Sequence, residues 1–125
     1  MLLLGKSIND YKGKSHRMAD LLPFHAKKGN LTVGYRKLKG LNNSLILKKG
    51  EQINGHEFHH WQLEGIKSTM KNNRSKREIG LNPPWEINGW GLKPSKEGWS
   101  NRFLHASWVH LHWPSSSNVL DLWLK

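Results

Sequence analysis

The stretch Ala106-Ser-Trp-Val-His-Leu-His-Trp113 is apolar and aromatic except for one serine and two histidines. Successive side chains of a strand point to opposite faces, so residues two apart share a face. A strand over 104–113 therefore brings His110 and His112 side by side, on the face that also carries Leu104, Ala106 and Trp108. Two imidazoles on a predicted core strand indicate chemistry, although hydrogen-bonded structural histidines explain the same pattern.

The composition limits the chain to one domain with a modest core. The 125 residues are 36% hydrophobic, include seven Trp and have a mean hydropathy of −0.70. The apolar start, Met1-Leu-Leu-Leu4, is too short for a signal sequence or a membrane span, so we expect a cytoplasmic protein with no membrane partner. The absence of cysteine excludes disulfides, thiolate zinc sites and a thiol nucleophile within this chain.

The net charge of +11 and the pI near 10.1 are typical of proteins that bind nucleic acid or acidic membranes. The basic residues are scattered, however, and the one dense cluster, Lys67 to Arg77, lies among turn-forming residues. Such a run is typical of a solvated loop, and a phosphate-binding patch is the other interpretation. The scatter disfavours nucleic acid as a partner, and a small basic nucleic-acid-binding module stays as the alternative function.

Hydrophobic patterns and turn signals divide the chain into short elements of α+β or partial α/β order. We expect the end of a helix at 1–8, a short buried strand at 18–23, a hairpin of strands 31–35 and 44–47, and a strand at 55–61. Residues 74–102 hold Trp among Gly and Pro, which is typical of an irregular loop or a short hairpin. Residues 115–118 predict the N-cap of a short helix, with an apolar face of Val119, Leu120, Trp123 and Leu124.

The run His56-Glu-Phe-His-His60 satisfies the H-E-x-x-H signature of zinc proteases. That signature needs a helix, which places both histidines on one face with the glutamate beside the metal-bound water. The turn signal Asn54-Gly55 and the strand pattern of 55–61 oppose a helix here. In a strand, His56 and His60 face away from Glu57, so we expect no metal site.

Two stretches together resemble signature segments of the cobyrinic acid a,c-diamide synthase family, in its C-terminal glutamine amidotransferase domain. The first is Gly55-His-Glu-Phe-His59, and the second is the tandem-histidine stretch Ala106 to Trp113, which resembles A-S-Y-x-H-x-H-F. Supporting matches at 4–6, 18–23 and 34–36 resemble the L-G-K, M-x-G-L-L-P and G-Y-R segments of the family. The departures are Asp20 in place of glycine, which puts a charge near the predicted strand, and Trp108 and Trp113 in place of tyrosine and phenylalanine.

The resemblance implies an α/β fold for residues 1–125: the C-terminal portion of a class I, flavodoxin-like glutamine amidotransferase domain. In this family a cysteine elbow precedes the segment that resembles 1–6, so we expect a chain truncated after its nucleophile and inactive alone as an amide ligase. Whether it is a relic, a frameshift product or half of a split enzyme stays open.

The resemblance also implies roles for individual residues. His110 corresponds to the catalytic histidine, and His112 occupies the position where many amidotransferases have an orienting glutamate. His56, Glu57 and His59 are candidates for orienting or active-site contacts, and equally for structural or interdomain roles. The full-length enzyme uses ATP, Mg²⁺, glutamine and a corrinoid. This chain has no P-loop, since 29–34 lacks the following Lys-Ser/Thr, so we expect it to bind no cofactor and to have the missing N-terminal part as its partner.

Overall fold

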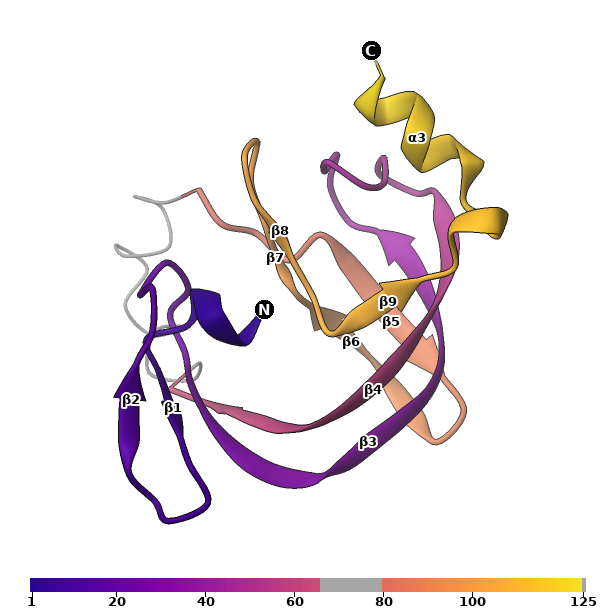
Figure 1. The fold of residues 1–125 in the computed structure, drawn as a ribbon. Coiled ribbons are helices and arrows are strands. Elements are labelled where there is room, and N and C mark those ends of the chain that lie inside the picture. Colours follow the sequence, from indigo (N-terminus) through magenta and orange to yellow (C-terminus); the bar gives the residue numbers. More distant parts are fainter. Residues whose placement is uncertain (66–79, 125) are drawn as a thin grey trace. The chain divides into compact units, whose positions relative to one another are not determined.

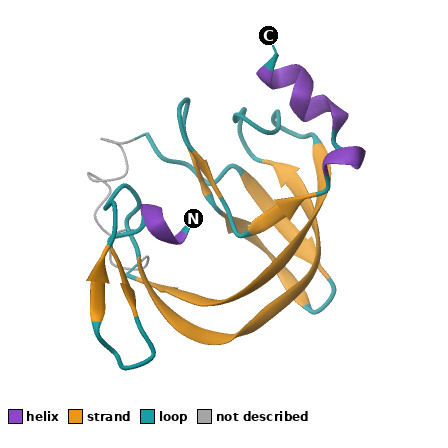
Figure 2. Cartoon of the chain, in the orientation of Figure 1, coloured by secondary structure: helices purple, strands orange, loops and turns teal. Residues whose placement is uncertain are grey.

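A computed structural model describes residues 1–65 and 80–124 of the chain (Figures 1 and 2). The basic cluster 67–77 lies outside these described residues. The described elements, mostly strands, are η1 Leu2–Leu4, β1 Ser7–Asn9, β2 Ser15–Arg17, β3 His25–Gly40, β4 Gln52–Glu64, β5 Trp85–Gly89, β6 Leu92–Glu97, β7 Trp99–Ser100, β8 His105–Ala106, β9 Val109–Leu111, η2 Trp113–Ser115 and α3 Ser117–Trp123.

The main sheet is mixed and mostly antiparallel. Its strands follow the order β2-β1-β3-β4-β9, β5 pairs with β3 and β6 pairs with β5, while β7 and β8 form a separate two-stranded sheet. The β1–β3 pair is parallel, whereas the β1–β2, β3–β5, β5–β6 and β4–β9 pairs are antiparallel. Antiparallel neighbours need no helical crossover. Accordingly, the described residues form a mostly antiparallel sheet with few and short helices. The expected α/β fold is therefore seen only as a sheet accompanied by these short helices.

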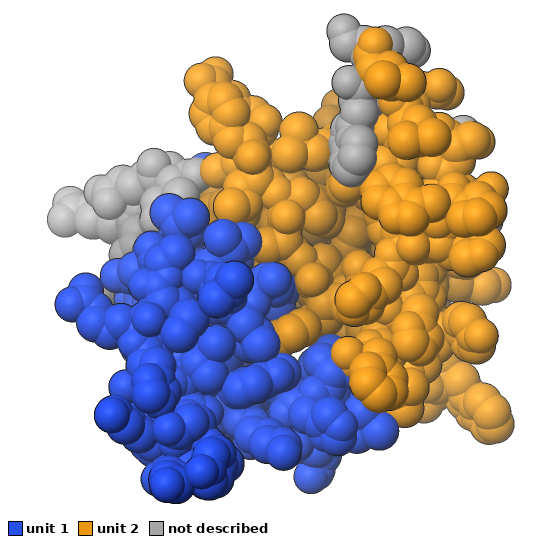
Figure 3. Space-filling view, viewed as in Figure 1, with its two compact units in different colours: residues 1–32, 59–80 blue, residues 33–58, 81–125 orange. Residues whose placement is uncertain are grey.

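The chain divides into two compact units, coloured separately in Figure 3. Unit 1 comprises Met1–Thr32 and His59–Gly80, and unit 2 comprises Val33–Phe58 and Leu81–Lys125. The long strands β3 and β4 run from one unit into the other. In the described part of the chain, no helix has the length and apolar character needed to cross a membrane.

In unit 1, the segment predicted as a strand at 18–23 is a loop, and that prediction was wrong. Its amide groups bond to the first residues instead: Asp20 N donates to Gly5 O (2.9 Å) and Leu22 N to Leu4 O (2.7 Å). Residues 1–8 likewise hold one 3-10 turn followed by β1, not the end of a longer helix. Leu22 and Phe24 are buried, and a Cβ on Gly5 would collide with the Phe24 ring.

Asp20 adopts a left-handed backbone conformation, with φ of 55°. Its side chain is exposed, so its charge does not lie in a buried strand. Left-handed backbone costs an L-residue roughly 1–2 kcal/mol, less for aspartate, and glycine avoids this cost. The glycine that the resembling family has at this position therefore suits the backbone better than Asp20.

We expect Asp20→Gly to raise the free energy of unfolding by about 0.5 kcal/mol, because the relief of strain exceeds the added entropy of the unfolded chain. Asp20→Ala is the matched variant and is expected to lower it by about 1 kcal/mol. Urea unfolding of the three proteins measures both changes. Equal stability of the alanine and glycine variants would show that the backbone conformation of residue 20 is not limiting.

The core of unit 2 gathers residues from the strands and from the loops between them. Its buried members are Leu38, Ile46, Leu47, Ile53, Trp85, Ile87, Val109 and Val119. The predicted strand 31–35 lies inside β3 and the predicted strand 55–61 inside β4, so both are confirmed. The predicted strand 44–47 was wrong. Ser44 Oγ accepts hydrogen bonds from the amides of Ile46 (3.3 Å) and Leu47 (3.1 Å), which closes a local turn in place of a strand ladder.

Two further expectations concern 74–102 and the C-terminus. Within the described part of 74–102, β5 and β6 form the short hairpin, with fully exposed Trp90 at its tip.

The C-terminal helix is confirmed as α3, but the expected side-chain N-cap is absent. Ser116 Oγ donates instead to His112 O at 2.7 Å. Val119 is buried, whereas Leu120 and Leu124 are exposed, so only part of the apolar face packs on the core.

Candidate active site

The predicted strand 104–113 is interrupted, so that prediction was wrong as one continuous element. Residues 105–106 form β8 and residues 109–111 form β9, with Ser107 and Trp108 between them (Figure 1). Ala106 and Val109 are both buried although they are three residues apart. An unbroken strand buries residues at even spacing. The expected common face of Leu104, Ala106 and Trp108 with His110 therefore does not form.

Glu97, at the end of β6, binds both residues of the interruption. Its carboxylate accepts hydrogen bonds from Ser107 Oγ (2.7 Å) and from the amide of Trp108 (3.0 Å), as well as from the Trp85 indole (2.7 Å). Burial raises the pKa of Glu97 above its usual value, and the three donors act against that rise. The sequence gives no indication of this contact, because a lone glutamate in a turn-rich stretch carries no signal of burial.

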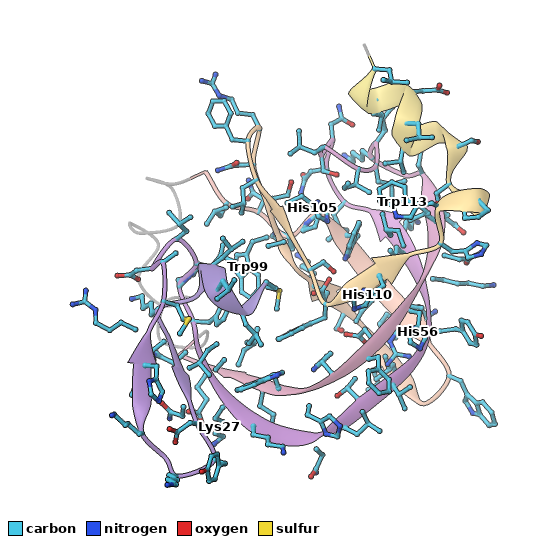
Figure 4. The ribbon with its side chains drawn as sticks, in the orientation of Figure 1. Lys27, His56, Trp99, His105, His110 and Trp113 are labelled. Atoms are coloured by element: carbon cyan, nitrogen blue, oxygen red, sulfur yellow. The ribbon has the colours of Figure 1, made fainter. Side chains whose placement is uncertain are left out.

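The structure brings two of the predicted site residues directly together. His56 on β4 is the cross-strand partner of His110 on β9 (Figure 4). Gly55 is the partner of Leu111. Directly opposite residues of an antiparallel pair have Cβ atoms about 5 Å apart. A Cβ on Gly55 would collide with Val109 Cγ1 and would lie 2.9 Å from His110 O. Glycine at 55 thus allows the strand that carries His110 to approach β4.

His112 joins this pair in one pocket of unit 2. The pocket has a volume of about 810 Å³, and His56, His110 and His112 all line it, together with Tyr35, Asn88 and Trp90. His110 is exposed, and the His56 ring stacks on Phe58 with 6.4 Å between ring centroids. Three of the five predicted site residues therefore share one solvent-accessible hollow.

Glu57 and His59 make other contacts. Glu57 is 5% exposed and accepts a hydrogen bond from Arg36 Nε at 2.5 Å, and Arg36 is 4% exposed. A buried charge is retained at low cost only when it is paired in this way. His59 lies in unit 1, where its Nδ1 is 3.1 Å from Trp61 O. The pocket that holds His110 is not lined by either residue.

Known proteins resemble this chain over the segments that form the site. Residues 1–118 match the family described as the CobB/CobQ-like glutamine amidotransferase domain. The chain belongs to this family. Its relatives include the cobyrinate a,c-diamide synthases of Gloeobacter violaceus (32% identical over 114 residues, 90% of this chain), Salmonella typhimurium (26%, 99% of this chain) and a Synechococcus strain (30%, 100% of this chain).

This amidotransferase-family chain spans about a quarter of the length of those relatives, between 22% and 25%. No solved structure matches it. The Arg36–Glu57 ion pair joins two segments that carry the resemblance, one at 34–36 and the other at 55–59. Two segments that are distant in the sequence are therefore held together by a buried contact of unit 2.

In the amidotransferase-family chain, the segments 29–34 and 56–60 do not have the backbone conformations that their phosphate-binding and metal-binding motifs require. Residues 29–34 belong to the extended strand β3, not to a loop that could cradle phosphates. His56 and His60 belong to the extended strand β4, not to the helix that the zinc-protease signature needs. Within residues 1–65 and 80–124, no group of three or more His, Asp or Glu side chains is placed to hold a metal ion.

A second pocket, of about 550 Å³, is also lined by His110 in unit 2 of this amidotransferase-family chain. Its lining is mainly apolar and includes Trp85, Trp113 and His105. The His105 ring lies 4.5 Å from the Trp85 ring, and its two buried nitrogens have no hydrogen-bond partner among the described residues. Burial lowers the pKa of His105 to about 4. His105 is therefore neutral at physiological pH.

Proposed function

We propose that residues 1–125 are the C-terminal part of the class I, flavodoxin-like α/β amidotransferase domain of a cobyrinate a,c-diamide synthase, a cytoplasmic enzyme of cobalamin biosynthesis. The observation that carries the proposal is the placement of His110 opposite His56, in one pocket with His112, in a chain of this family. The names of the relatives supply the substrate, cobyrinate.

In this proposal, His110 is the general base for glutamine hydrolysis. A cysteine thiol outside this chain loses its proton to His110, and the thiolate attacks the side-chain amide carbon of glutamine. His110 then returns the proton to the departing ammonia, and water hydrolyses the thioester to glutamate. His110 is exposed and lines the pocket, so its ring is accessible to a thiol that approaches from outside the chain.

His112 and the buried residues have separate roles in the proposal. His112 lines the same pocket as His110 and can exchange a hydrogen bond with it or with the substrate, but neutral imidazole supplies no fixed negative charge. Glu57 acts indirectly, since its carboxylate is bound to Arg36. ATP, Mg²⁺ and the corrinoid belong to the remaining part of the synthase, which would act as the partner of this chain and accept its ammonia on an activated carboxylate.

The chain alone is expected to release no ammonia from glutamine, because it contains no cysteine. Mixed with, or fused to, the preceding part of the Gloeobacter violaceus synthase, it is expected to support conversion of cobyrinate to the a,c-diamide with glutamine. In that assembly His110→Ala should lower glutamine-dependent turnover by about 10²–10⁴-fold, the usual contribution of a general base. Chromatography of the a,c-diamide product measures turnover in two parallel reactions, one with glutamine and one with added ammonium salt.

Turnover with ammonia should be unaffected in the His110→Ala assembly, because the base serves only ammonia release. His60→Ala is the matched control, since His60 is exposed on β4 and does not line the pocket. Full glutamine use by the His110→Ala assembly would assign His110 a structural role and contradict the proposal.

A further inference from the structure

The carboxylate of Glu97 binds the segment that precedes β9. Glu97 accepts hydrogen bonds from three groups of unit 2: the Trp85 indole N–H, the Ser107 hydroxyl and the Trp108 amide, at 2.7, 2.7 and 3.0 Å. An ionised carboxylate can accept all three, and charge-assisted bonds of this kind are stronger than neutral ones. One of the three donors comes from the fully buried Trp85, which anchors the carboxylate to the core.

The contacts continue from Glu97 to the residue before His110. Ser107 Oγ donates to Glu97 and accepts a hydrogen bond from the Val109 amide at 2.8 Å. Glu97 thus fixes Ser107 and Trp108 directly and Val109 through one hydroxyl. Val109 and His110 are in turn paired with Glu57 and His56 on β4. The position at which His110 enters the sheet is therefore set by the carboxylate of a different hairpin.

Gly98, the residue after Glu97, leaves the backbone little freedom to adopt another conformation. Gly98 has φ of 81°, and a Cβ there would lie 2.8 Å from Ala106 O. β7 and β8 therefore approach closely, directly before the interruption at Ser107. A glutamate that precedes this close contact has its carboxylate directed at 107–108, as the hydrogen bonds record.

We propose that Glu97 is the positioning residue that holds His110 opposite His56 for the reaction. The proposal rests on the proposed function, because it takes His110 as the base. It assigns Glu97 no contact with substrate. The carboxylate acts through the Ser107 hydroxyl and the backbone of 108–109, and its loss frees the start of β9 to shift against β4 by small distances that a base cannot tolerate.

The first test uses the full chain and NMR spectroscopy. In Glu97→Gln, the amide side chain can no longer accept all three hydrogen bonds, so we expect exchange of the Trp108 and Val109 amides to accelerate about tenfold, the equivalent of one lost hydrogen bond. The cross-peaks between the His56 and His110 rings should weaken, and the Trp85 indole N–H signal should shift. Glu97→Asp keeps the charge on a shorter side chain and should restore part of each signal.

Two further variants make the test robust. Ser107→Ala removes only one link, so it should accelerate Val109 exchange while leaving the Trp85 indole signal in place; it serves where Glu97→Gln does not fold. Glu86→Gln on β5 is the matched control, a glutamate of the same hairpin, and should change none of these signals. Unchanged exchange at 108–109 and unchanged His56–His110 contacts in folded Glu97→Gln would overturn the proposal.

The second test uses the assembly with the preceding part of a relative. Glu97→Gln is expected to lower kcat with glutamine at least about tenfold, leave KM within about twofold, and spare turnover with ammonia, because only the base is displaced. Unchanged kcat with glutamine would overturn the positioning role while leaving the proposed function intact. Absence of glutamine-dependent turnover in the wild-type assembly would overturn the proposed function itself, and the NMR data would still decide whether Glu97 fixes His110.

Discussion

Replacing Arg36 by methionine is expected to lower the free energy of unfolding by about 3–5 kcal/mol, the usual effect of leaving one member of a buried ion pair alone. Arg36 and Glu57 are 4% and 5% exposed, so water cannot take the place of the lost guanidinium at the Glu57 carboxylate. Glu57→Gln is expected to have a smaller effect of the same sign, because a neutral amide can still accept from Arg36. Urea denaturation followed by circular dichroism measures both.

The controls come from the same chain. The double variant Arg36→Met/Glu57→Leu removes both charges and should recover most of the lost stability, since the cost lies in the unpaired charge and not in the absence of the bond. Lys27 and Glu64 form an ion pair in unit 1 with about half of each side chain exposed. Lys27→Met should cost less than about 1 kcal/mol. Equal costs for Lys27→Met and Arg36→Met would contradict the importance of burial.

Acidification from pH 6.5 to pH 4 is expected to lower the free energy of unfolding by about 3 kcal/mol through His105 alone. The reason is that folding lowers the pKa of His105 from 6.5 to about 4. The sign follows from proton binding. In this interval the unfolded chain binds a proton at residue 105 and the folded chain does not, so protons favour unfolding. Well above pH 6.5 both states are neutral at this residue and the effect vanishes.

His105→Phe is expected to abolish this pH dependence and to raise stability at pH 7 by about 1–2 kcal/mol, because phenylalanine keeps the ring contact with Trp85 and has no buried nitrogens without partners. Thermal or urea unfolding between pH 4 and pH 8 measures the difference. Glu97 has a raised pKa and contributes with the opposite sign in both proteins, so the wild-type minus variant curve isolates His105. The exposed His60, changed to Asn, is the control; an identical flattening in that variant would contradict the assignment to His105.

Alternation of side chains predicted the strand around His56 correctly. The opposite faces of His56 and Glu57 appear in β4 as expected, because the buried positions of that strand, Ile53, Gly55 and Glu57, alternate with less buried ones. The motifs also indicated the correct family, since residues 1–118 match it. Both inferences need only neighbours in the sequence or a family's fixed pattern of residues.

The wrong predictions share one cause, which is hydrogen bonding that the alternation of side chains does not reveal. The strand predicted at 104–113 is interrupted where Ser107 and Trp108 donate to Glu97, which lies ten residues from Ser107 along the chain and has no local signature. The segment 44–47 is apolar enough for a strand, yet the Ser44 hydroxyl satisfies two of its amides locally. The segment 18–23 turns at Asp20 and bonds to residues 3–5. In each case a hydrogen bond invisible to periodicity decided the backbone path.

Gly55 has a consequence for how this sequence can vary. Every missense change that one nucleotide can make in a glycine codon introduces at least a Cβ, and here that atom meets Val109 and the backbone of His110. Position 55 thus has no conservative neighbour in the genetic code. In a saturation mutagenesis library, tolerance at this codon should be lower than at Gly13 or Gly50, where a Cβ meets no atom within 4 Å and only the positive φ opposes substitution.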